Sequence, residues 1–174
     1  MKTTARVLLG AASALLLVAG SLAGGGGHQA TDTAQKTLGV HAYEVDGVEV
    51  ALSSVERTSG GTITVRWQYR NTTAEPKKLG ESFTGMGSSE AYSLEWDAYV
   101  VDTGARVKYK VLKDTKGDPV AANHGGRKVV VLPPKGTKTV WAKFLVPVGV
   151  KQVTVFLPGV EPFEDVKIAE MKQQ

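Results

Sequence analysis

Hydrophobic and polar residues alternate one by one through much of the chain after residue 45. The clearest example is 62–70, in which Ile63, Val65, Trp67 and Tyr69 are separated by Thr, Arg and Gln residues. Successive side chains of a β-strand point to opposite faces of its sheet. The segment therefore predicts a strand with its apolar residues in a core and the polar residues between them in water.

The same alternation predicts further strands at 48–55, 93–101, 105–112, 137–146, 151–157 and 163–168. The residues expected to point inward are Leu94, Trp96, Ala98 and Val100 in 93–101, Val107, Tyr109 and Val111 in 105–112, and Val140, Ala142, Phe144 and Val146 in 137–146. The continuous apolar run at 129–132 predicts a short strand that is covered on both faces.

Turn residues separate these segments, as in Ser59-Gly60-Gly61, Asp102-Thr103-Gly104 and Pro133-Pro134-Lys135-Gly136. Gly adopts positive φ without strain, and Pro cannot donate a hydrogen bond to a strand ladder. We find no helical period after residue 23. The pattern predicts an all-β fold, an antiparallel immunoglobulin-like β-sandwich of about seven or eight strands.

The first 23 residues have the layout of a secretory signal peptide. Lys2 and Arg6 give a basic start, Val7–Ala19 is an apolar run, and small residues lead up to Ala23. The run is too short for a lasting membrane span. We expect a helical leader that is cleaved between Ala23 and Gly24, and a protein that works outside the cytoplasm, secreted or in the cell envelope.

Four consecutive glycines, Gly24–Gly27, open a polar segment with little apolar content. This composition predicts a flexible tether at 24–40, followed by one β-sandwich domain at 41–170 and a short tail at 171–174. Removal of the 23-residue leader from the 174 residues leaves 151, which suits a single domain.

The mature protein is only slightly basic. Of 21 basic and 17 acidic residues, Lys2 and Arg6 leave with the leader, so the net charge becomes +2 and does not favour nucleic-acid binding. The chain has no cysteine, which excludes thiol catalysis and thiolate metal sites. Bacterial lipoproteins carry their lipid-anchored cysteine where this chain has Gly25. Unless a cysteine has been replaced there, we expect release without a lipid anchor.

Several motifs that suggest a metal or catalytic site lack their partners. His28, His41 and His124 do not have the spacing of a zinc site, and Met86 with His124 would be too few ligands for copper. Asn123–Arg127 resembles an oxyanion loop, but no Gly-x-Ser-x-Gly elbow accompanies it.

The acidic motifs have ordinary structural explanations. Asp114–Asp118 resembles the start of a calcium loop but lacks the later acidic ligands, so we expect a tight hairpin turn. Glu95 and Asp97 share a face of a predicted strand at a spacing that suits an acid–base pair, yet that face points outward. Asn71-Thr72-Thr73 matches a glycosylation acceptor, which we interpret as a chance match in a turn. We expect no enzyme activity, metal or cofactor.

Positive charge gathers in 105–151, which has eleven Lys or Arg residues and only two Asp residues. The candidate binding face comprises Arg106, Lys108 and Lys110 on the outward face of one predicted strand, and Trp141 and Lys143 on that of another. A Trp among cations suits an acidic cell-wall polymer, a sugar or a negatively charged partner protein of the envelope. Alternatively, the lysines only protect exposed strand edges, and Trp141 is covered by a neighbouring strand or by Phe156.

Four segments resemble a group of uncharacterised exported domains of actinobacteria: Val55–Ser59, Ile63–Trp67, Tyr109–Asp114 and Val153–Val166. More distantly, the chain is similar to the immunoglobulin-like secreted antigens of mycobacteria. The resemblance implies an immunoglobulin-like sandwich in the envelope or medium, and no particular activity. The group often carries a cysteine pair after the third segment, but Asp114–Asn123 has none, so any disulfide or thiol role is absent here.

These observations favour a secreted, non-catalytic binding or interaction module of the bacterial cell envelope. Two alternatives remain open. One is a passive structural or antigen-like extracellular protein without a dedicated ligand. The other is a hydrolase whose site is assembled from polar residues scattered along the chain.

Overall fold

The structure is a computed structural model that describes residues 37–79, 94–122 and 130–170. All described residues belong to one compact unit, which lies within Ala34–Gln174. Several predicted features lie outside the described residues. These are the leader with its cleavage position, most of the tether, the tail, His28, Met86, His124 and the loop at 123–127.

The described part of the chain is an all-β fold built from antiparallel sheets, as the alternating pattern predicts. Its strands are β1 (Gly39–Ala42), β2 (Val48–Thr58), β3 (Thr62–Asn71), β4 (Lys77–Leu79), β5 (Tyr99–Asp102), β6 (Val107–Lys110), β7 (Val130–Leu132), β8 (Thr137–Leu145), β9 (Gln152–Phe156) and β10 (Phe163–Lys167). Within these ranges the only helical element is the 3₁₀ turn η1 (Ser59–Gly61), which connects β2 and β3.

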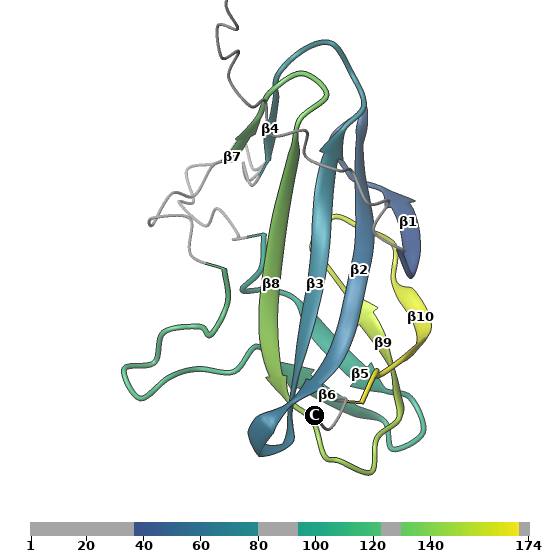
Figure 1. Cartoon of the computed structure of the whole chain (residues 1–174), viewed down its shortest axis with the longest axis vertical. Coiled ribbons are helices and arrows are strands. Elements are labelled where there is room, and N and C mark those ends of the chain that lie inside the picture. The colour runs from purple at the N-terminus through teal and green to yellow at the C-terminus, as the bar shows by residue number, and fades with distance from the viewer. Residues whose placement is uncertain (1–36, 80–93, 123–129, 171–174) are drawn as a thin grey trace, which may run out of the picture. The chain divides into compact units, whose positions relative to one another are not determined.

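The strands form two four-stranded sheets and one short ribbon (Figure 1). The first sheet has the order β1-β2-β3-β8 and the second the order β10-β9-β5-β6. The ribbon pairs β4 with β7 and continues beyond the paired ends of β3 and β8. Consecutive strands therefore lie side by side in four antiparallel pairs, β1–β2, β2–β3, β5–β6 and β9–β10.

β3 and β8 confirm the predicted inward faces. Trp67 and Tyr69 on β3 are fully buried, as is Phe144 on β8. One polar residue of β3, Thr64, departs from the prediction because it is only 2% exposed. Thr64 lies between Glu56 on β2 and a lysine on β8, and the aliphatic parts of such long side chains can cover a short neighbour.

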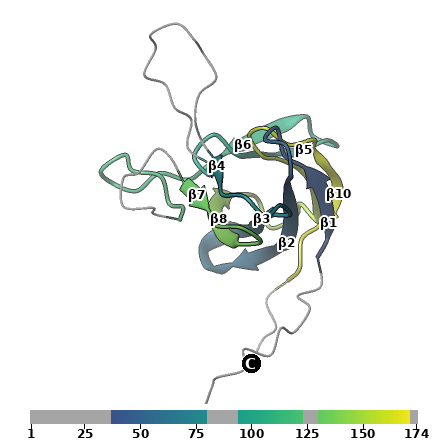
Figure 2. The same cartoon turned by 90° about the horizontal axis from the view of Figure 1, so that it is seen from above.

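Side chains from both sheets form one hydrophobic core, which the strands surround when the fold is seen from above (Figure 2). Backbone bridges also link the two sheets along their edges. Val111, which follows β6, bridges to Phe144 on β8. Ala169, which follows β10, bridges in parallel to Glu56 on β2. These bridges connect the two sheets, at β8 on one side and at the second half of β2 on the other.

The predicted strand at 93–101 is wrong in its first half. Residues 94–97 form a turn, and β5 begins at Tyr99. Trp96 is 53% exposed although it was expected inward, and Glu95 is 3% exposed although it was expected in water. Alternation assigns side chains to faces only where the backbone is extended, so it does not hold for the turn at 94–97.

The remaining differences concern strands at the margins of the sheets. Val107, expected inward, is 40% exposed because it is the first residue of the edge strand β6. Val131 in β7 is 57% exposed, so that strand is not covered on both faces. β4 was not predicted, and Gly39 and Val40 at the end of the predicted tether belong to β1.

Candidate binding surface

β6 presents two exposed lysines on the outer face of the second sheet. Lys108 pairs with Val101 of β5, and Lys110 pairs with Tyr99. Val100, between those two β5 residues, is fully buried, so both lysines share the face that points away from the core. Arg106 precedes β6 and lies in a turn, with φ of +57°. The prediction that Arg106 belongs to the strand is therefore wrong.

Lys108 lies over an aromatic pair that sequence reasoning did not find. Its Nζ atom is 3.5 Å from the centre of the Tyr99 ring. The Tyr99 ring stacks on Phe156 of β9, with 4.6 Å between centroids and 10° between planes. Both rings are half-buried, and they form an apolar base under the ammonium group. Phe156 therefore packs on Tyr99 of the second sheet, whereas Trp141 belongs to the first.

Trp141 and Lys143 lie on the outer face of β8, as predicted, and both are half-buried. Trp141 pairs with Arg66 of β3, and its backbone oxygen accepts a hydrogen bond from Ala122 N–H at 2.8 Å. The segment around residues 120–122 thus runs beside β8 next to Trp141. This arrangement agrees with the alternative that a neighbouring strand segment covers part of the indole.

The bridge between Val111 and Phe144 brings the two groups of cations together. The next backbone contact, from Leu112 N–H to Lys143 O, measures 2.8 Å and continues the same antiparallel register. In that register Lys143 stands opposite Leu112, and Lys110 is its diagonal neighbour on the outer face. We call Arg106, Lys108, Lys110, Trp141 and Lys143 the basic seam, because these residues lie on β6 and β8 or, for Arg106, in the turn that precedes β6.

The cations of the basic seam have no neutralising partner among the described residues. Within 37–79, 94–122 and 130–170, no carboxylate oxygen lies within 4.0 Å of their charged nitrogens. The ion pairs of cationic side chains found in those ranges use Arg57, Arg66 and Lys151. The field of the seam is therefore available to an anionic ligand.

A second polar group lies at the far end of β3. Glu95 is buried in the turn before β5, and loss of hydration raises the pKa of its carboxyl to about 7, an effect that Lys138 partly opposes. The neighbouring residue Leu94 accepts a hydrogen bond from the Tyr69 hydroxyl at 3.3 Å. Burial raises the pKa of Tyr69 as well. Sequence reasoning missed this group because it placed Glu95 on a solvated strand face with Asp97.

Two of the acidic and amide motifs are structural. Asp114 Oδ1 accepts the backbone N–H groups of Lys116 and Asp118, which confirms the predicted tight turn. Asn71 is 3% exposed, and its side chain bonds the backbone oxygens of Glu75 and Pro133, so the amide is occupied inside a turn. In the described residues, no cluster of three or more His, Cys, Asp or Glu side chains could hold a metal ion.

No family model, curated protein or solved structure matches this chain. Among the described residues, no helix has the length and apolar character needed to cross a membrane. The structure therefore defines an all-β protein, and the basic seam is its candidate binding surface.

Proposed function

We propose that the protein is a secreted, non-catalytic binding module of the bacterial cell envelope, and that its basic seam holds an acidic cell-wall polymer. The proposal includes cleavage after Ala23 and release without a lipid anchor. It involves no cofactor and no nucleic acid. Binding would depend on charge and shape complementarity without covalent chemistry.

The observation that carries the proposal is the position of the Lys108 ammonium group. Its ammonium group rests on the Tyr99–Phe156 stack, which holds the charge in place beside Lys110 and leaves it without a carboxylate among the described residues. A cation that is fixed before binding loses little side-chain entropy when a ligand arrives. Lys143 adds a third charge across the junction, so an extended anion could contact both strands.

The finer fold class is also part of the proposal. Two antiparallel sheets around one core support a β-sandwich of immunoglobulin-like architecture. The connectivity differs from the immunoglobulin order, because β2 and β3 pair within one sheet, whereas the second and third strands of an immunoglobulin constant domain belong to different sheets. The likeness therefore concerns the architecture and not the strand order.

The test is retention of the full chain on purified anionic cell-wall polymer. We expect retention at low salt and release at about 0.5 M salt, where screening acts within a few ångströms. The variant Lys108→Glu/Lys110→Glu should abolish retention, because two attractive charges become repulsive. Its melting temperature should stay close to that of the native protein, since both side chains are exposed.

The matched control is Lys77→Glu/Lys167→Glu, which changes the net charge equally at positions on β4 and β10, away from β6. This control should keep most of the retention. No retention of the native chain at low salt, or equal loss in both double variants, would exclude a dedicated basic seam. In that case the lysines would act only as protection of a strand edge.

A further inference from the structure

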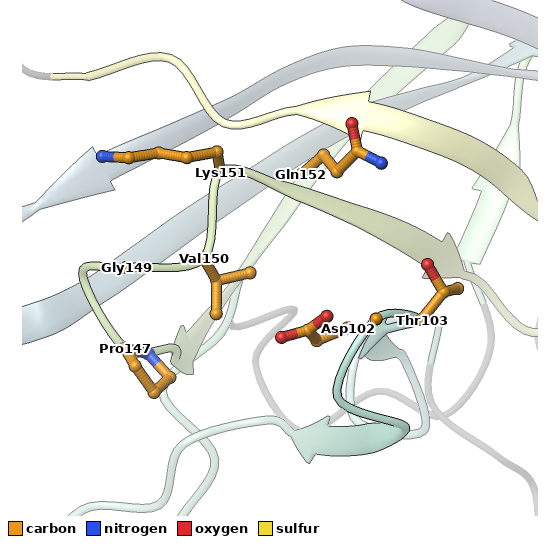
Figure 3. A pocket seen from close by; sticks show the side chains of 8 residues that line it. Asp102, Thr103, Pro147, Gly149, Val150, Lys151 and Gln152 are labelled. Atoms are coloured by element: carbon orange, nitrogen blue, oxygen red, sulfur yellow. The ribbon is translucent and has the colours of Figure 1, made fainter.

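A pocket of about 470 Å³ opens beside the start of the basic seam, between the β5–β6 turn and the β8–β9 turn (Figure 3). We propose that this pocket binds one neutral sugar ring of the acidic polymer. This inference rests on the proposed function, because the basic seam would hold the anionic groups of the same chain. A pocket of this volume falls within the range of small-ligand sites.

The polar groups of the pocket suit hydroxyl groups. Asp102 directs its carboxylate into the gap, and Thr103 follows it in the same turn (Figure 3). Gln152 also lines the pocket, but its side-chain amide donates to Asp165 Oδ1 on β10 at 3.4 Å. Asp102 Oδ1 already accepts the Ala105 N–H at 3.1 Å, which orients the carboxylate. The other carboxylate oxygen can accept a hydroxyl hydrogen, and such charge-assisted hydrogen bonds are short and strong.

The opposite wall is apolar. Val150 points its side chain toward Asp102, and Pro147 lies beside it (Figure 3). A sugar ring has hydroxyl groups around its edge and C–H groups on its faces, so one polar wall and one aliphatic wall match its two kinds of surface. The aliphatic wall does not favour a metal ion, and Asp102 is the only carboxylate among the described lining residues.

The charge distribution excludes an anionic group from the pocket itself. Lys151 belongs to the lining, but its side chain leads away from the gap, and its Nζ lies 3.0 Å from Glu170 Oε1 (Figure 3). The pocket therefore has the negative charge of Asp102 without a cation facing it. Anionic groups of a polymer would instead meet Arg106 and Lys108, which follow Asp102 along the same turn and strand.

The turn that forms the apolar wall is held by a buried arginine. Arg57 Nη1 donates to Val146 O and its Nη2 donates to Val150 O, both at 2.7 Å. The arginine is 5% exposed, so these bonds are shielded from water. A wall that is fixed before the ligand arrives favours binding, because little ordering is required.

The experiment is an amide NMR titration of the full, ¹⁵N-labelled chain with two neutral trisaccharides, one of glucose and one of N-acetylglucosamine. We expect shifts confined to 102–104 and 148–152, with at least one sugar binding at about millimolar Kd. The variant Asp102→Asn keeps the acceptor for Ala105 N–H but removes the charge. It should bind roughly tenfold more weakly. The control Asp118→Asn, in the exposed hairpin, should bind as the native chain does.

The double variant Lys108→Glu/Lys110→Glu separates this inference from the proposed function. Sugar-induced shifts in the two turns of that variant support the pocket, even if polymer retention is lost or was never found. Absence of shifts with both sugars up to about 50 mM, well above the expected Kd, overturns the inference. Shifts that Asp102→Asn leaves unchanged overturn it too.

Discussion

Buried ionisable groups are treated differently at the two ends of the β2–β3 pair. At one end the charge of Arg57 is largely compensated. Two backbone oxygens accept hydrogen bonds from its Nη atoms, and Glu170 lies 3.8 Å from its Nε, which itself makes no hydrogen bond. At the other end, burial raises the pKa of Glu95 to about 7, so the protonated form is favoured there. Arg57 thus stays charged inside the protein because hydrogen bonds stabilise its guanidinium group. For Glu95, the cost of burial exceeds the stabilisation of its charged form, so the neutral form is favoured.

The largest expected effect comes from removal of the compensated charge. Arg57→Met should lower the free energy of unfolding by about 3–4 kcal/mol, because the carbonyl groups of Val146 and Val150 lose their donors inside the protein. Urea denaturation would measure this loss. The control Arg66→Met breaks an exposed ion pair with Glu56 and should cost less than about 1 kcal/mol. Equal losses would contradict the contrast between the two arginines.

The next effect concerns Glu95 and depends on pH. Its pKa is raised in the folded state, so the folded protein retains a proton that the unfolded chain releases. Its contribution to stability is therefore complete below about pH 4.5 and is lost as pH rises through about 7, a change of roughly 2–3 kcal/mol. Glu95→Gln should flatten this part of the profile, measured by urea unfolding at several pH values. An unchanged profile would show that Glu95 is hydrated.

Asn71 tests whether hydrogen bonds also stabilise a neutral, buried side chain at the end of the β2–β3 pair that lies near Glu95. Its amide bonds Glu75 O and Pro133 O, and its Oδ1 accepts the Thr73 N–H at 2.9 Å. Asn71→Ala should cost about 2 kcal/mol of unfolding free energy, because buried partners remain unpaired. Thr72→Val, at the exposed neighbouring position, should cost less. A smaller loss for Asn71→Ala than for Thr72→Val would refute this assignment.

Glu170 gives the smallest effect. The hydrogen bond from Lys151, with a lesser contribution from Arg57, lowers the pKa of this exposed carboxyl. Its contribution to stability is present above the usual carboxyl range and is lost as pH falls through the lowered pKa. Glu170→Gln should therefore shift the urea midpoint slightly near neutral pH and by less in strong acid, where protonation of the native carboxyl removes its charge. A shift of the same size at both pH values would count against an electrostatic role.

Strands with one clearly buried face could be predicted from the sequence. β3, β8 and β9 each carry apolar residues at every second position, and the structure buries these residues as expected. The period of two fails at 94–97, because a turn interrupts the extension without Gly or Pro to mark it. It also gives no signal for β4, which has only three residues, two of them lysines.

The candidate surface could be predicted only in part. The excess of lysine and arginine in 105–151 is visible in the sequence, and the structure places Lys110 and Lys143 beside the same junction. The support of Lys108 by Tyr99 and Phe156 could not be foreseen, because it depends on which strands pair and in which register. The pocket likewise joins two turns that are far apart along the chain.

The bridge from Ala169 to β2 has a consequence for self-association. β1 covers the outer edge of β2 up to Leu52, and beyond it the backbone of Ala169 bonds Val55 and Arg57. Without the residues after Lys167, the second half of β2 would present unpaired amides to other molecules, and such bare edges template intermolecular strand addition. The segment after β10 thus covers part of a strand edge that would otherwise be open to strand addition.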